Sequence, residues 1–376
     1  MKKKVCKYLD SNLFGELHII NNQVHACTPK CCVLLDNVKI SELNVSDIQK
    51  QRQQFYENLN KGLNKTCEKC TFLIEKDEEN IDIGKLSNLI LHPYTTCNLH
   101  CNYCVLSEEK LKKKLLPNEN HLLNKIKDFY NNNLFKKDFS IALGGGEPSL
   151  IEDLKEIAQF LNNLEGKINL TLITNSSISN RIDYVISSLS NTPNIHKIIN
   201  TSLDSGTRET YKLLKNRDLF ESTCNNLRKY AKSNIFSTII LKYVMMNDNS
   251  NINKKDLKGF INFSKEIKNI TNANIQVIID ADMTIQKEGN DYFDESEIFK
   301  YIRLNKEQLR AAAYLYYNLK DDIKVLFCGG RINSERSLEG KLDVERIKNI
   351  ANRKIYIKKL FRIMNFIKIQ GIRDAL

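Results

Sequence analysis

The chain of 376 residues contains no tryptophan, only five prolines and only 14 glycines. This composition excludes a collagen-like chain and gives no sign of a long disordered one. Long apolar runs are also missing: the run from Phe236 to Met246 is interrupted by Lys242 and is shorter than the roughly 18 residues that a membrane span needs. The N-terminus is lysine-rich and lacks the apolar core of a signal peptide. We therefore expect a soluble cytoplasmic protein without a membrane span.

Acidic residues are in deficit, with 45 against 57 lysines and arginines, for a formal charge of +12. The lysines are spread along the whole chain, which favours a solvated basic surface. An acidic partner, such as a phosphorylated substrate or an acidic peptide, is the other interpretation. The sequence has no zinc finger, helix-turn-helix or aromatic RNA-binding motif, so a nucleic-acid partner is not expected.

Cysteine, by contrast, is well represented, with 11 residues, most of them in clusters. In a chain without a secretion signal such clusters indicate metal binding rather than disulfides. Cys97, Cys101 and Cys104 place three thiols within eight residues. Three thiolates leave a four-iron cluster one ligand short, and the open iron can bind a small molecule. The alternative is a zinc knuckle that lacks one ligand or uses His100 as its fourth.

This spacing resembles the signature of the radical S-adenosylmethionine (SAM) enzymes, and Tyr103 supplies the aromatic residue before the third cysteine. Gly144-Gly145-Gly146-Glu147-Pro148 resembles the glycine-rich motif of the family, and Ser202-Leu203-Asp204 resembles its ribose-contacting strand end. The resemblance covers residues 86 to 285. It implies that the three cysteines hold a SAM-binding 4Fe-4S cluster and that SAM is the second cofactor.

The resemblance also implies a set of residues that contact SAM. These are Tyr103, Gly144, Gly145, Gly146, Glu147, Asn175, Ser202, Asp204 and Lys242. Glycines allow close approach of a ligand to the backbone, and carboxylate and hydroxyl oxygens suit ribose hydroxyls. For Glu147, Ser202 and Asp204 the alternative is an ordinary cap or turn residue, and Lys242 can equally face solvent.

Residues 1–80 form a cysteine-bearing module ahead of the core. Its order is Cys6, a predicted hairpin over 15–27 that ends in Cys27, a helix over about 45–59, and the pair Cys67 and Cys70. This order resembles the auxiliary-cluster modules called SPASM or twitch, which usually follow the core instead of preceding it. We expect a second 4Fe-4S cluster on these four cysteines, with Cys31 or Cys32 as a substitute ligand and structural zinc as the alternative.

From residue 86 onward, apolar strands alternate with helical segments, which predicts an α/β fold with a parallel sheet. The predicted strands are 89–92, 139–143, 168–175, 195–202, 237–246 and 274–280. Six such units resemble the partial (β/α)6 barrel of the radical SAM core, in which the motifs lie at the carboxyl ends of the strands. We thus divide the chain into a small N-terminal cysteine-rich module (1–80), the core (86–285) and a helical C-terminal extension (286–376).

In the extension we expect a helix over 293–320, a strand over 324–330 and a basic amphipathic helix over 353–368. Cys328 precedes two glycines at the end of that strand. It is a candidate catalytic residue, as a hydrogen-atom donor to a substrate radical. Ligation of a cluster and a buried apolar role are the alternatives.

The expected function is reductive cleavage of SAM to a 5′-deoxyadenosyl radical, which abstracts hydrogen from a peptide or protein substrate. Oxidation, crosslinking or epimerisation is the expected outcome, with a flavodoxin or ferredoxin as reductant. Radical oxidation or epimerisation of a sugar or aminocyclitol is the alternative. A non-catalytic iron–sulfur scaffold or electron carrier is the alternative from another class.

Overall fold

A computed structural model describes residues 1–20, 23–27, 32–68, 70, 72–92, 97–104, 122–282, 304–327 and 344–352. One large sheet dominates this part of the chain. Its strands are β2 (Glu16–Ile20), β3 (Gln23–His25), β4 (Val33–Leu35), β6 (Leu86–His92), β7 (Phe135–Leu143), β8 (Ile168–Thr174), β9 (Ile195–Ser202), β10 (Thr238–Met245), β11 (Asn274–Ala281) and β12 (Lys324–Phe327). They lie in the order β12-β11-β10-β9-β8-β7-β6-β2-β3-β4.

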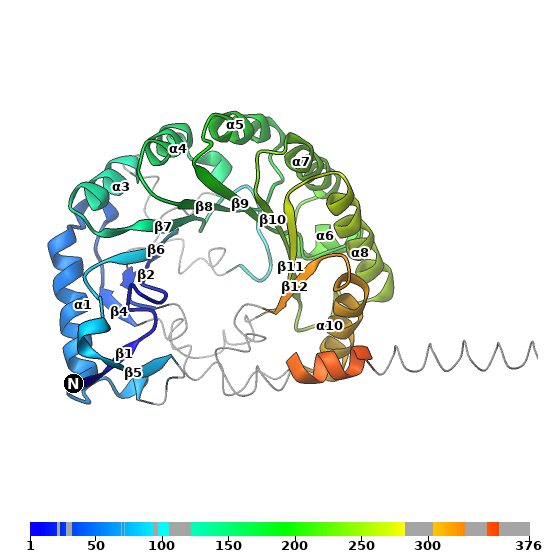
Figure 1. Ribbon diagram of the computed structural model, residues 1–376. Helices are drawn as coiled ribbons and strands as arrows, with labels where there is room; N and C mark the ends of the chain where they lie inside the picture. Colours follow the sequence, from blue (N-terminus) through cyan, green and yellow to red (C-terminus); the bar gives the residue numbers. More distant parts are fainter. Residues whose placement is uncertain are drawn as a thin grey trace, which may run out of the picture.

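Eight neighbouring strands of this sheet, from β12 to β2, run parallel. They curve into an arc, and within the described residues the end strands β4 and β12 do not pair with one another (Figure 1). The sheet is therefore an open barrel. All six strands predicted from apolar alternation are confirmed, and so is the α/β class.

Helices cover the outer face of the arc (Figure 1). They are α1 (Val45–Asn60), α3 (Leu122–Asn131), α4 (Leu154–Asn162), α5 (Ser179–Ser190), α6 (Arg208–Lys215), α7 (Phe220–Ser233), α8 (Lys254–Asn269) and α10 (Lys306–Leu319). In β8, Ile168, Leu170 and Leu172 are buried and alternate with half-buried residues. The period of two explains this pattern, because alternate side chains face the helices and the inside of the barrel.

The hairpin predicted over 15–27 is confirmed as β2 and β3, whose antiparallel register joins Ile20 to Gln23. The sequence did not predict that β2 also pairs in parallel with β6, from Glu16 opposite Asn88 to Ile20 opposite His92. The helix α1, which lies between these two strands in the chain, covers the outside of the sheet (Figure 1). The division at residues 80–86 stays a prediction, and the sheet is continuous across it.

A second, two-stranded sheet pairs β1 (Lys2–Cys6) with β5 (Leu73–Asp77). The fully buried Arg52 of α1 connects this region to the large sheet. Its guanidinium donates to four backbone oxygens, those of Ile83 at 2.9 Å, Glu16 at 3.0 Å, Leu9 at 2.5 Å and Lys85 at 3.3 Å. A planar cation with five donors suits this task, because it pairs several carbonyls that would otherwise be buried without partners.

The predicted C-terminal helix is confirmed over Lys306–Leu319, where Asn305 and Gln308 form a capping box. Residues 344–352 are also helical. Cys328 and the basic segment 353–368 lie outside the described residues. A search of the described helices for one long and apolar enough to cross a bilayer found none.

Candidate functional site

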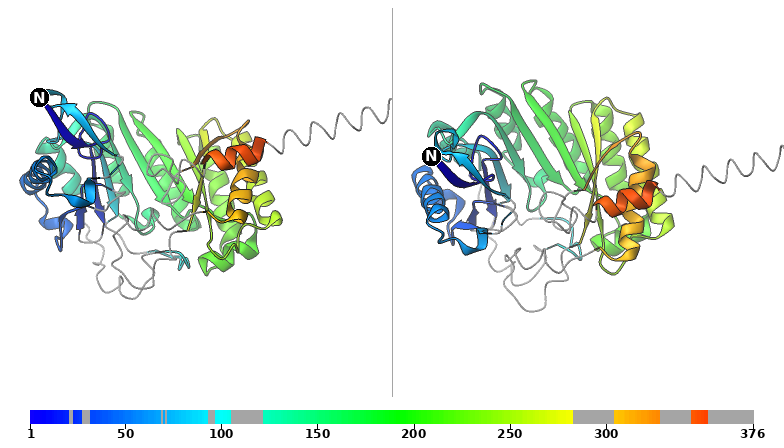
Figure 2. Two further views of the ribbon diagram at one scale, coloured as in Figure 1. Left: turned by 90° about the horizontal axis from the view of Figure 1, so that it is seen from below. Right: turned by 60° about the horizontal axis from the view of Figure 1, so that its bottom comes forward.

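The segment 97–104 follows β6 and lies at the rim toward which the parallel strands run (Figure 2). Cys97, Cys101 and Cys104 are all half-buried. Burial raises the pKa of the Cys97 thiol to about 11, and the nearby Glu147, Cys101 and Cys104 add to the rise. Three thiols this close in a partly open loop fit the donor set of an iron–sulfur cluster.

Within the described residues, no three His, Cys, Asp or Glu side chains converge tightly enough to hold a single metal ion. A cluster places a different requirement on the protein, because each thiolate binds a different iron. The arrangement of Cys97, Cys101 and Cys104 is therefore compatible with a cluster, and the zinc knuckle stays the alternative.

The carboxyl end of β8 holds one side of this cysteine loop. Asn175 donates from Nδ2 to Asn98 Oδ1 at 2.9 Å, and the same nitrogen lies 3.5 Å from Cys97 Sγ. Asn98 in turn donates to Ser177 Oγ at 2.8 Å. Asn175, which sequence analysis placed at the site, thus contacts the loop and one of its thiols.

The C-terminal end of α6 holds the other side. The Asn102 amide donates to the Leu214 carbonyl at 2.9 Å, and Asn216 Nδ2 donates to the His100 carbonyl at 2.7 Å. Asn216 adopts a left-handed conformation, with φ of 53°, which ends α6 and turns its side chain toward the loop. Hydrogen bonds from two separate elements therefore fix the position of the cysteine loop.

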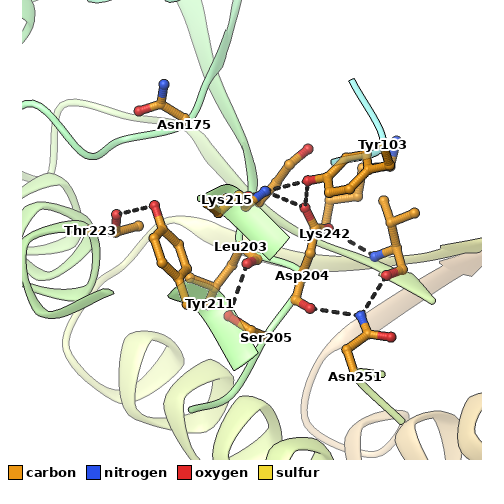
Figure 3. Close-up of polar contacts among 12 residues, drawn as sticks. Tyr103, Asn175, Leu203, Asp204, Ser205, Tyr211, Lys215, Thr223, Lys242 and Asn251 are labelled. Atoms are coloured by element: carbon orange, nitrogen blue, oxygen red, sulfur yellow. Dashed lines mark hydrogen bonds and ion pairs between the residues drawn. The ribbon is translucent and has the colours of Figure 1, made fainter. Parts of the chain in front are cut away.

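Tyr103 of the loop forms a polar cluster with the buried side chains of Asp204 and Lys215 (Figure 3). Lys215 Nζ is 2.6 Å from Asp204 Oδ2, and their side chains are 1% and 0% exposed. The Tyr103 hydroxyl bonds to both partners. Burial favours the neutral amine, but the Asp204 carboxylate outweighs it and raises the pKa of Lys215 above its usual value. Lys215 therefore stays a cation.

The other oxygen of Asp204 accepts the Val244 amide at 2.8 Å. The Asp204 carbonyl accepts from Asn251 Nδ2 at 2.8 Å, and the residue has φ of 59°. Asp204 is thus engaged by the protein itself, through both carboxylate oxygens and its carbonyl. Its role as a ribose contact stays a prediction.

The glycine-rich motif follows β7. Gly145 has φ of 95°, a conformation that side chains strongly disfavour. A Cβ on Gly144 would lie 2.9 Å from His92 Nε2. Glu147 is buried and accepts from Thr174 Oγ1 at 2.5 Å and from the Asn175 amide at 2.7 Å. Burial raises the pKa of Glu147, although these hydrogen bonds oppose the rise. The motif is therefore joined to the end of β8.

Two further predicted contacts lie on the next strands. Ser202, at the end of β9, is half-buried, and its carbonyl accepts from Lys215 Nζ at 2.8 Å. Lys242 of β10 forms an ion pair, with its Nζ 3.2 Å from Asp280 Oδ2. Burial would lower the pKa of Lys242, and the Asp280 carboxylate outweighs it and raises that pKa.

The cysteines of the N-terminal segment also gather at one place. Five cysteines line a small cavity of about 10 Å³: Cys6, Cys27, Cys32, Cys67 and Cys70. Cys32 Sγ lies 3.8 Å from Cys67 Sγ. Hydrogen bonds with Cys27 and Cys67, together with burial, raise the pKa of Cys32. The four predicted ligands are thus side by side with one of the proposed substitutes, and Cys31 lies outside the described residues.

Sequence analysis missed Lys215, although one signal could have identified it. Tyr211, Leu214 and Lys215 occupy the buried face of α6 at positions i, i+3 and i+4, so the lysine falls on the apolar side of an amphipathic helix. A lysine there requires a buried partner, which Asp204 provides.

A histidine group was also missed. His18, His25 and His92 come from β2, β3 and β6, and His18 Nε2 lies 3.2 Å from His92 Nδ1. Only the unpredicted pairing of β2 with β6 brings them together. Cys224 of α7 is buried, as a small apolar residue would be.

Comparison with known proteins agrees with this geometry. The family model described as Radical SAM superfamily matches residues 91–257. A "Probable GTP 3′,8-cyclase" of Saccharolobus islandicus is 25% identical over 260 residues, which cover 65% of this chain and 78% of the relative. The Caenorhabditis elegans molybdenum cofactor biosynthesis protein moc-5 is 26% identical over 176 residues, 45% of this chain and 26% of that protein.

Among solved structures, Streptococcus suis SuiB bound to S-adenosylmethionine is 14% identical with a TM-score of 0.45. The match covers 74% of this chain but only 56% of the SuiB chain. SuiB bound to its precursor peptide SuiA is 13% identical, also with a TM-score of 0.45. The family match coincides with the cysteine loop, the glycine-rich motif and the strands that carry them, and residues 91–257 of this chain therefore form a domain of the radical SAM superfamily.

Proposed function

We propose that this enzyme holds a 4Fe-4S cluster on Cys97, Cys101 and Cys104, binds SAM beside it, and abstracts hydrogen from a peptide or protein substrate. The observation that carries the proposal is the cysteine loop itself, which places three half-buried cysteines within eight residues after the carboxyl end of β6. Held by these three thiolates and reduced, the cluster would supply the electron for reductive cleavage of SAM to a 5′-deoxyadenosyl radical.

The protein's own residues bind and orient. Gly144 and Gly146 flank Gly145, and a backbone without side chains allows the methionyl end of SAM to approach closely. Glu147 is a candidate partner for the SAM ammonium group through its Oε2, which accepts the Asn175 amide, while its Oε1 accepts from Thr174 Oγ1 and the Ser149 amide. Ser202 is the candidate ribose contact, and Lys242 is a candidate contact in its pair with Asp280.

Anaerobic reconstitution tests this function. Protein loaded with iron and sulfide, then reduced with dithionite and given SAM, is expected to form 5′-deoxyadenosine, which chromatography detects. Cys101→Ala removes one cluster ligand and is expected to abolish product, whereas the buried Cys224→Ala serves as the matched cysteine control. A wild-type protein that binds iron but forms no 5′-deoxyadenosine would support the scaffold or electron-carrier alternative.

Three substrate classes are candidates. A peptide or protein substrate follows from the resemblance to enzymes with an auxiliary cluster, and the charge of +12 favours an acidic substrate. A nucleotide is the second candidate, because a relative with 25% identity is named as a GTP 3′,8-cyclase. A sugar or aminocyclitol, which the enzyme would oxidise or epimerise, is the third candidate substrate.

Substrate-dependent turnover separates these classes. We expect an acidic peptide library to raise the yield of 5′-deoxyadenosine above the uncoupled level, and GTP and aminocyclitols to leave it unchanged. Stimulation by GTP alone would overturn the peptide proposal. Should peptides be productive, Cys328→Ala tests hydrogen donation, since an unchanged product would rule out that role.

We also propose a second 4Fe-4S cluster on Cys6, Cys27, Cys67 and Cys70, with Cys32 as the nearest substitute ligand. The convergence of these five thiols on one cavity supports it. The Cys97→Ala/Cys101→Ala/Cys104→Ala variant is expected to retain about four irons per chain, which metal analysis measures. Zinc without iron in this variant would instead establish a structural zinc site.

A further inference from the structure

We propose that Asp204 and Lys215 are positioning residues for SAM that act through Tyr103. This inference rests on the proposed function, because it concerns the geometry of the cluster loop at which SAM would bind. Its starting point is that Asp204 is 0% exposed, with one carboxylate oxygen engaged by Val244 and the other by Lys215 and Tyr103. So placed, the Asp204 carboxylate acts on its protein neighbours through both of its oxygens.

Lys215 is saturated in the same way. An ammonium group has three donors, and its three acceptors here are Asp204 Oδ2 at 2.6 Å, the Ser202 carbonyl at 2.8 Å and the Tyr103 hydroxyl. Tyr103 can then donate its own proton to Asp204. Each polar group of the trio has its partner, and such a fully connected buried network holds a single geometry.

The network controls the cysteine loop because Tyr103 belongs to it. Tyr103 lies between Cys101 and Cys104, and its ring packs against Leu214, Val244 and Met246. The Lys215 ammonium also lies 4.9 Å from the centre of the ring. Fixing the phenol at its hydroxyl end therefore fixes the short chain between two proposed cluster ligands.

Lys215 further links this network to the backbone clamp of α6. Its own carbonyl accepts from the His100 amide at 3.3 Å, while the next residue, Asn216, donates to the His100 carbonyl. The side chain and the main chain at this helix end thus hold the same loop from two directions. Loosening either one is expected to change how SAM sits on the cluster without removing any thiol.

Tyr103→Phe is the sharpest test, because it removes only the hydroxyl. The iron content and the electron paramagnetic resonance spectrum of the reduced cluster are expected to match wild type in the absence of SAM. The SAM-induced change in that spectrum is expected to require about tenfold more SAM, as the loss of one charge-assisted hydrogen bond predicts. Tyr184→Phe on α5 is the matched control, because it removes a hydroxyl that donates to the Glu152 carbonyl.

A second variant removes the charges. Lys215→Met alone would leave a buried carboxylate without its cation, so it is combined with Asp204→Asn, which restores a neutral pair of similar shape. The double variant is expected to bind iron and to show the same weakened SAM response. Lys212→Met, at an exposed position of the same helix, is expected to behave as wild type.

If Tyr103→Phe needs no more SAM than wild type for the spectral change, the inference is overturned, whether or not the double variant folds. The same holds if the folded double variant needs no more SAM than wild type. If reduced wild-type protein itself shows no spectral response to SAM, the proposed function fails. The two failures are therefore distinguishable.

Discussion

Replacing Arg52 by methionine should reveal how strongly the N-terminal segment is bound to the barrel. The variant keeps a long apolar side chain but removes a guanidinium that donates to four backbone carbonyls. Hydrogen bonds from a charged donor contribute about 1.5–3 kcal/mol each, so the four together amount to roughly 6–12 kcal/mol. Burying the cation costs several kcal/mol of this.

The net loss is expected to be about 3–5 kcal/mol in the free energy of unfolding, because the carbonyls of Leu9, Glu16, Ile83 and Lys85 all lose a partner. Urea unfolding followed by circular dichroism measures it. Hydrogen exchange should show faster exchange in β2 and residues 83–85 than elsewhere. Lys50→Met, at an exposed position of the same helix, is the control. A loss within about 0.5 kcal/mol of that control would refute the reasoning.

Three further predictions follow from the site. Gly144→Ala places a Cβ 2.9 Å from His92 Nε2, so a loss of about 1–3 kcal/mol in urea unfolding is expected, and no loss would show that the ring moves freely aside. Burial lowers the pKa of His18 well below its usual value and that of His92 to about 4, so the unfolded chain binds protons that the folded chain does not. Stability should therefore fall as pH drops from about 7 toward 4, and less steeply in His92→Phe; equal slopes would contradict this. Cys224→Ala should leave metal content unchanged and cost about 1 kcal/mol, and loss of iron would make Cys224 a ligand.

The strands of the barrel were predictable because each one contacts helices on one side only. That geometry leaves an apolar alternation in segments such as Ile168–Thr174, which a single sequence displays. Helix starts were predictable for a similar local reason. Thr207, for example, caps α6 by accepting the Thr210 amide.

Partners distant in sequence were not predictable in this way. The pairing of β2 with β6 joins residues about 70 positions apart, and no local pattern encodes such a register. Lys215 shares its residue type with many exposed lysines, and only its position on the apolar face of α6 sets it apart. Asp204 was placed correctly at a strand end, but whether a carboxylate binds ligand or protein depends on neighbours such as Val244 and Lys215.

The pairing of β2 with β6 has a practical consequence for anyone who shortens this protein. Deleting the cysteine-rich N-terminal segment would strip a strand from the catalytic sheet and leave the backbone groups of β6 unpaired along a new edge. Exposed edges of this kind template association between chains. Truncation at residue 85 should therefore yield insoluble protein, and the segment cannot be grafted or removed as an independent cassette.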